Sequence, residues 1–289
     1  MKQENHCRGF TLTEILVGLT LLGLILGTLC QIFLSQAEAN KRQTRVLRGQ
    51  QGLRMALEII ARDFKSAGYP FGDHPFLSDL SVWVPDSFVP KAPQAVTPTG
   101  VLTVTSGGNQ PDLLSLFTVL SSESNPTVLA QATLVGDTLI RLAINGSQTN
   151  EQYNLSDMIY IGKPAEPALV KEISGPCLTI DTDPVKPGNQ GLKKAYPPGT
   201  EVGEISLVSY AVFNDQNDTG GHYHEVGVPV LKRKTNACGF EPLVEDVTDL
   251  KVILIKNDLY RLQVSVAKGL PRTGDGSTLT MSTRVMKRN

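Results

Sequence analysis

The feature that most constrains this chain is an uninterrupted apolar run near its N-terminus. From Ile15 to Leu34 the sequence reads ILVGLTLLGLILGTLCQIFL and contains no charged residue. About twenty such residues in an α-helix cover the roughly 30 Å hydrocarbon core of a bilayer. The sequence therefore predicts one membrane-spanning helix at about residues 15–34.

The polar residues around this run do not follow the order of a secretory signal, in which a small-residue cleavage site comes after the apolar stretch. Here a short polar leader, MKQENHCRG, ends in Gly9 before the run begins. Ser35-Gln36-Ala37 does place small residues where a signal peptidase reads, which leaves open a secreted chain that starts at Glu38. That alternative does not explain the residues between Gly9 and Glu14.

Those residues are specific enough to suggest a family. The stretch from Arg8 to Glu14, RGFTLTE, followed by an apolar run, resembles the type III signal of type IV prepilins and pseudopilins. The resemblance implies cleavage after Gly9 by a membrane prepilin peptidase and N-methylation of the new N-terminal residue, Phe10. It also implies that Glu14, the fifth mature residue, registers the subunit against an amino terminus during assembly.

A role for Glu14 is also reasonable on physical grounds. An ionised carboxylate at the edge of hydrocarbon is costly unless it is paired, and a cationic α-amine is a suitable partner. The alternative is a glutamate that lies in the headgroup layer at the end of a helix. The orientation of the helix follows from the resemblance, because the cations Lys41, Arg42, Arg45 and Arg48 after the run oppose the positive-inside rule.

The helical pattern continues beyond the membrane run to about Ala67. Apolar positions recur alternately four and three residues apart, which predicts a single stripe on one helix face. The stripe consists of Val46, Gln50, Leu53, Leu57, Ile60 and Phe64. A helix from Phe10 to Ala67 would be about 85 Å long, so we expect its second half to dock on a soluble body. Gly68 and Pro70 predict its end.

The charges argue against a nucleic-acid partner. The chain has 27 basic and 28 acidic residues, so no overall field attracts a polyanion. Lys41, Arg45 and Arg48 share a helix face and could meet lipid phosphates, a neighbouring subunit or DNA. Without interleaved aromatic residues, a solvated face is the favoured interpretation.

The remainder of the chain is expected to be rich in β-structure. Aromatic residues make up only 6%, whereas 26 glycines and 18 prolines suit short strands and turns. We expect a 1–9 leader, a 10–67 helix, a 68–100 connector and a 101–289 globular domain, giving an α+β, pilin-like fold with a mostly antiparallel sheet. The expected strands are 101–105, 113–120, 138–144, 158–161, 168–173, 204–213, 225–232, 250–255, 259–266 and 277–285, with a hairpin turn at 256–258.

Several segments narrow the resemblance to PilW-type minor pilins, which are relatives of the J-type pseudopilins of type II secretion. The segments are Leu57–Tyr69 with its Ala-Arg-Asp and Ala-Gly-Tyr elements, Asp157–Ile161, Ser209-Tyr210, Leu231-Lys232-Arg233, Leu243–Leu250 and the terminal Arg288-Asn289. The resemblance implies a precursor that spans the inner membrane once with its body extracytoplasmic, and that later enters a pilus filament or its tip. The implied partners are other minor and major pilins, the prepilin peptidase, the inner-membrane assembly platform and lipid. The implied work is to prime filament assembly and cap the tip.

Two other functions remain open at this point. A J-type pseudopilin would share the N-terminal helix and differ in its partners. A membrane-tethered or secreted β-rich binding protein would use the N-terminus only as an anchor or signal. No phosphate loop, nucleophile elbow or paired-histidine zinc helix occurs, so we expect no enzyme activity and no cofactor.

Two small groups of residues were considered for other sites. Asp215, Asn217 and Asp218, just before His222 and His224, are a weak calcium candidate, although they lack the full loop pattern of an EF-hand. A polar loop explains the same residue types. Cys177 and Cys238 are the only cysteines of the body, and they form either a disulfide or two separate thiols.

Overall fold

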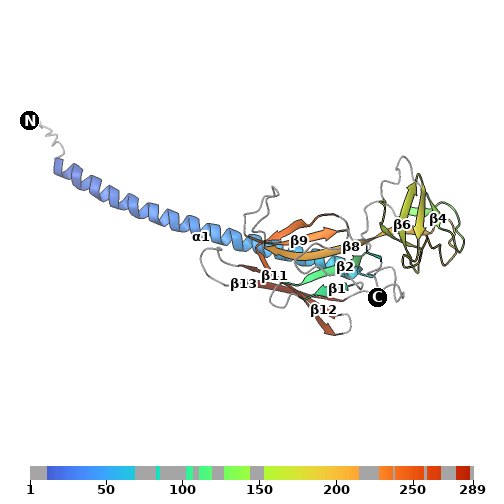
Figure 1. Cartoon of the computed structure of the whole chain (residues 1–289). Coiled ribbons are helices and arrows are strands. Elements are labelled where there is room, and N and C mark those ends of the chain that lie inside the picture. Colours follow the sequence, from blue (N-terminus) through green and yellow to red (C-terminus); the bar gives the residue numbers. More distant parts are fainter. Residues whose placement is uncertain are drawn as a thin grey trace, which may run out of the picture. The chain divides into compact units, whose positions relative to one another are not determined.

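The computed structural model describes residues 12–68, 83–84, 102–106, 111–118, 127–143, 153–214, 228–236, 238–256, 259–267 and 278–286. They form an α+β protein with one long helix and antiparallel strands, as predicted (Figure 1). The elements are α1 (Leu12–Ser66), β1 (Leu102–Thr105), β2 (Leu113–Thr118), β3 (Thr127–Leu129), β4 (Leu139–Ala143), β5 (Met158–Ile161), β6 (Glu166–Ser174), β7 (Cys177–Asp181), β8 (Glu201–Asn214), β9 (Pro229–Thr235), β10 (Glu241–Glu245), β11 (Val247–Lys256), β12 (Leu259–Ala267) and β13 (Thr278–Met286). Contacts divide the chain into two units, 1–48 and 49–289.

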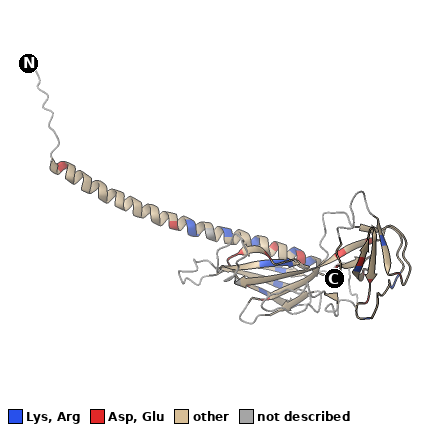
Figure 2. Ribbon diagram, turned by 45° about the horizontal axis from the view of Figure 1, so that its top comes forward, with Lys and Arg blue, Asp and Glu red and all other residues tan. Residues whose placement is uncertain are grey.

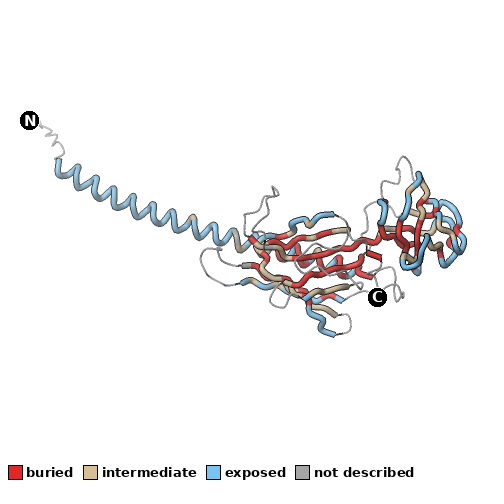
Figure 3. The backbone as a smooth tube through the Cα atoms, in the orientation of Figure 1, coloured by how far each residue is buried: buried red, intermediate tan, exposed pale blue. Residues whose placement is uncertain are grey.

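The first unit contains the apolar part of α1. All residues from Leu12 to Gln36 are exposed, and this stretch of the tube is pale blue in Figure 3. At its other end the helix stops at Ser66, and Gly68 adopts a positive φ of 82°. Glycine reaches that left-handed conformation without strain, so the predicted helix stop at Gly68 is confirmed.

In the second unit, α1 buries one face. Leu53, Ile60 and Phe64 are completely buried, and Leu57 is nearly so. They share a core with side chains from β2, β8, β11 and β12. The stripe predicted from the spacing of apolar residues is therefore the face that packs on the body, and its burial supplies much of the stabilisation of this part of the helix.

β8 organises the larger sheet. Its first residues, as far as Ile205, pair with β3 and β5, and the rest of the strand pairs with β2 and β9. The path of strands is β1-β2-β8-β3-β4-β7-β6-β5, and β9 and β10 continue from β8. A second sheet has the order β11-β12-β13. A separate apolar cluster fills the part built from β3 to β7.

Ten strands were predicted and all are present, β5 with the predicted ends and the other nine with shifted ends. The largest shift is in the segment expected at 225–232, where β9 begins only at Pro229 and continues to Thr235. Three further strands, β3, β7 and β10, were not predicted. β11 and β12 are antiparallel neighbours across residues 257–258, which confirms the predicted hairpin. The connector expected at 68–100 lies mostly outside the described residues.

Candidate functional site

The apolar half of α1 is built to lie in a non-aqueous environment. Among the described residues, α1 is the helix long and apolar enough to cross a membrane, with a mean hydropathy of 2.3 over its best window. Its hydroxyl groups are satisfied internally, because Thr20, Thr28 and Ser35 each donate to a carbonyl three residues earlier at 2.8 Å. The sequence has no charged residue between Glu14 and Glu38, and the long apolar part of the helix ribbon is tan in Figure 2. This surface suits lipid or other apolar helices.

Glu14 lies at the beginning of this surface. It belongs to the first turn of α1, where the unpaired N–H groups of a helix favour negative charge. The residue is exposed in the structure. The expected cleavage position, Gly9, and the expected new N-terminus, Phe10, lie outside the described residues.

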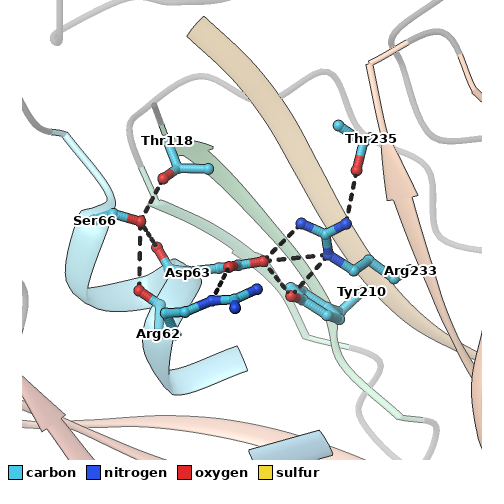
Figure 4. Close-up of polar contacts among 7 residues, drawn as sticks. All are labelled: Arg62, Asp63, Ser66, Thr118, Tyr210, Arg233 and Thr235. Carbon is cyan, nitrogen blue, oxygen red and sulfur yellow. Dashed lines mark hydrogen bonds and ion pairs between the residues drawn. The ribbon is translucent and has the colours of Figure 1, made fainter. Parts of the chain in front are cut away.

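At the opposite end of α1, three polar side chains meet, which we call the Asp63 cluster: Asp63, Tyr210 and Arg233 (Figure 4). The Tyr210 hydroxyl donates to Asp63 Oδ2 at 2.6 Å. Arg233 donates to the same oxygen from Nη2 at 2.9 Å and from Nε at 3.2 Å. The Asp63 side chain is only 3% exposed, so the carboxylate is held by charge-assisted hydrogen bonds away from water.

The β-sheet register explains how the cluster forms. Tyr210 of β8 lies directly opposite Arg233 of β9, so the two side chains project from the same face of the sheet. Asp63 reaches that face from the last turn of α1. Burial, followed by the charge of Asp63, raises the pKa of Tyr210 and keeps it a neutral donor. Burial opposes the charged form of Arg233, but its contacts with Tyr210 and Asp63 raise its pKa overall.

Contacts with β2 also hold the end of the helix. The hydroxyl groups of Ser66 and Thr118 lie 2.5 Å apart. Ala67 forms an isolated β-bridge with Thr118, and the Gly68 amide donates to the Phe117 carbonyl at 3.0 Å. The last turn of α1 is therefore fixed to the sheet by both side-chain and backbone hydrogen bonds.

The Asp63 cluster unites three of the segments that carry the PilW-type resemblance. Asp63 belongs to the Ala-Arg-Asp element, Tyr210 to Ser-Tyr, and Arg233 to Leu-Lys-Arg. Sequence reasoning noticed each segment but did not predict that they meet. The available signal was the chemistry, because an aspartate on the apolar side of a helix requires a buried partner.

Of the two alternatives left open for Cys177 and Cys238, a disulfide or separate thiols, the structure contains two free thiols. Cys177 begins β7 and pairs in register with Ser174, whereas Cys238 is exposed in the turn after β9. The two residues therefore correspond to the alternative of separate thiols. The calcium candidate, Asp215, Asn217 and Asp218, lies outside the described residues. Within the described residues no group of three or more acidic, histidine or cysteine side chains could hold a metal.

Comparison with known proteins identifies one match. Residues 5–29 match the family model described as the prokaryotic N-terminal methylation motif. No curated protein and no solved structure matches the chain. The matched region contains Gly9, Phe10 and Glu14 and the first fifteen residues, 15–29, of the apolar run. The motif indicates a type IV pilin-like or pseudopilin protein that is processed at its N-terminus, and its family is structural, not enzymatic.

Proposed function

We propose that this pilin-like protein is a minor pilin of a type IV pilus. Prepilin peptidase cleaves it after Gly9 and methylates Phe10 while residues 15–34 span the inner membrane and the body is extracytoplasmic. The subunit then joins other minor pilins, primes filament assembly and caps the tip. The observation that carries this proposal is the methylation motif running directly into a helix whose residues 12–36 are all exposed.

The exposed apolar surface of α1 must be buried by lipid or by protein. Large apolar side chains such as Leu24 and Phe33 are about 70% exposed, and each would gain roughly 1.5–3 kcal/mol by full burial. The bilayer supplies that burial in the precursor. In a filament the helices of neighbouring subunits would supply it, and Glu14 would register the subunit against the amino terminus of a neighbour.

The Asp63 cluster supports a function in which helix and body move together. A subunit is extracted from a membrane through its helix, so the body must remain attached to the helix end. The hydrogen bonds of Asp63 with β8 and β9, and those of Ser66 and Gly68 with β2, provide that attachment. A protein anchored only by a cleaved or passive leader has no need of such a junction.

The proposal is tested by locating the protein in cells. We expect a full-length chain with an epitope tag to be recovered in sheared filaments at a low ratio to the major pilin. Deleting the gene should lower the number of filaments. The tagged protein remaining in the inner membrane, with filament number unchanged, would contradict the proposal. Normal pili together with lost type II secretion would assign the chain to the J-type pseudopilins instead.

A further inference from the structure

The end of the β11–β12–β13 sheet exposes an unusual combination of side chains. Alternate residues of these strands face the core, among them Val252, Leu262 and Val264. On the opposite face Ile253, Arg261 and Arg284 lie in one row across the three strands. We call this row, together with Ile255 and Met286, the hairpin-end patch.

The two arginines of this patch are not explained by the fold. Arg261 and Arg284 are direct cross-strand partners, and like charges in that position destabilise a sheet. Across the described parts of the chain neither guanidinium forms an ion pair or a hydrogen bond with a carboxylate. Lys256, exposed at the end of β11, adds a third positive charge. Among the described residues the patch therefore has no anionic partner.

The apolar side chains of the patch are also left exposed by the fold. Ile253, Ile255 and Met286 are between 41% and 63% exposed. The register shifts between Leu254 and Lys256, which marks a β-bulge at this end of the hairpin. Methionine and arginine are both enriched at protein interfaces relative to the rest of the surface. A bare lipid-binding surface would not require the two arginines to be adjacent.

The position of the patch within the second unit is defined by contacts with α1. Val266, near one end of β12, approaches Gly49, where α1 enters this unit. Tyr260, near the other end of β12, packs edge-on against Phe64, with ring centroids 4.9 Å apart. The patch lies at the Tyr260 end, about 20 Å along β12 from Val266. It is therefore displayed beside the C-terminal end of the helix.

We propose that the hairpin-end patch docks a neighbouring extracytoplasmic subunit through an aliphatic surface that carries carboxylates. The paired guanidinium groups of Arg261 and Arg284 bind those carboxylates, and Ile253 and Met286 pack against the apolar part. This inference rests on the proposed function as a filament subunit, and it identifies the surface and chemistry of one contact. Burial against carboxylates removes the Arg–Arg repulsion that the isolated subunit bears.

The first test is photo-cross-linking in cells. A photoreactive residue replaces Ile253 in the full-length chain, and a matched control replaces Leu139, which is similarly exposed on β4. We expect cross-linking from residue 253 to a segment of another subunit with acidic and aliphatic residues, and none to that segment from residue 139. No protein cross-link from residue 253, or the same product from both positions, would overturn the proposal.

The second test changes the charges. Arg261→Glu combined with Arg284→Glu should lower the yield of the residue 253 cross-link by about tenfold, because like charges across an interface oppose association. Changing the mapped partner carboxylates to lysine should restore the yield. Arg141→Glu, which reverses an exposed charge on β4, should leave it unchanged. An unchanged yield in the doubly reversed variant would overturn the proposal, and urea unfolding of that variant verifies that it is folded.

A lipid partner is the competing outcome. The full chain is reconstituted through its apolar helix in phosphatidylcholine vesicles and mixed with fluorescent vesicles containing 30% phosphatidylglycerol. We expect the reconstituted protein to capture the same amount of fluorescent vesicles with and without the Arg261→Glu and Arg284→Glu substitutions. If vesicle capture depends on the two arginines and residue 253 forms no protein cross-link, the partner of the patch is lipid and the proposal is overturned. N-terminal processing and recovery in filaments are measured in the same strains, so failure of this contact is distinguishable from failure of the pilin function.

Discussion

The hydroxyl group of Tyr210 donates to Asp63 Oδ2 at 2.6 Å, although the two residues are 147 positions apart in the sequence. The bond joins the long central strand of the sheet to the last turn of the long helix. Arg233 neutralises the same carboxylate from the neighbouring strand. One buried oxygen therefore connects three elements.

The Asp63 cluster should contribute strongly to stability. Asp63→Ala leaves the half-buried guanidinium of Arg233 without its counter-charge, and we expect a loss of about 3 kcal/mol in the free energy of unfolding. Tyr210→Phe removes a neutral hydroxyl that donates to Asp63 and accepts from Arg233 Nε, and it should cost about 1 kcal/mol because the Asp63–Arg233 ion pair remains. Urea unfolding of the detergent-extracted full chain measures both. Arg62→Ala, at a side chain that is 73% exposed, is the control and should cost under about 0.5 kcal/mol. Equal losses in the free energy of unfolding for Asp63→Ala and Arg62→Ala would contradict a stabilising role of the Asp63 cluster.

Gly52 should be required for close packing of α1. A Cβ atom at this position would lie 2.8 Å from a methyl carbon of Val244. Alanine is favoured over glycine in a helix by about 1 kcal/mol, but we expect the clash to prevail and Gly52→Ala to destabilise the protein by about 1 kcal/mol. Combining it with Val244→Ala should recover part of the loss. A more stable Gly52→Ala variant would show that Val244 moves aside at no cost.

Glu204 should make stability depend on pH. Burial, followed by the charge of Asp157, raises the pKa of Glu204 to about 7, while Asn236 Nδ2 donates to its carboxylate at 2.6 Å. Between about pH 4.5 and pH 7 the folded chain keeps a proton that the unfolded chain has lost, so the free energy of unfolding falls as pH rises. Allowing for partial exposure, the effect is about 1 kcal/mol.

The check on Glu204 is a comparison of two pH series. Glu204→Gln cannot ionise but can still accept from Asn236. As pH rises from 5 to 7.5, the free energy of unfolding of the wild type should fall through Glu204, whereas the variant lacks this titration. The free energy of unfolding of the variant minus that of the wild type should therefore be smallest at pH 5 and should increase with pH. Parallel curves for the two proteins would contradict the raised pKa.

Glu14 should act in assembly and not in processing. Glu14→Ala removes the carboxylate from the first turn of α1 and leaves Gly9 and Phe10 unchanged. We expect a cleaved and methylated N-terminus together with reduced recovery in sheared filaments. Mass spectrometry of the N-terminal peptide and immunoblots of the filament fraction measure the two effects. Normal recovery of the variant in filaments, with normal filament numbers, would remove this role.

The parts of the fold that were predicted are those whose signals are local. An apolar run without charges, a stripe of apolar residues that ends in Gly68, and alternating β-branched segments each report on their own structure. β11 and β12 were located to within three residues for the same reason. The helix and most of the strands of this chain can therefore be predicted from its sequence.

The missed strands have weak local signals. β3 is only three residues long and gains its pairing from β4 and β8. β10 reads EPLVE, where a proline and two glutamates argue against a strand, but it pairs only with β9 and so tolerates them at a sheet edge. The Asp63 cluster escaped prediction because its contacts depend on the register of β8 against β9, which no segment encodes alone.

The most direct test of the pilin assignment is the mass of the mature N-terminal peptide, measured on membrane-extracted protein from cells with and without prepilin peptidase. We expect a peptide that begins with methylated Phe10 and is absent from cells without the peptidase. A chain that begins at Glu38, or an uncut Met1 in both strains, would contradict it.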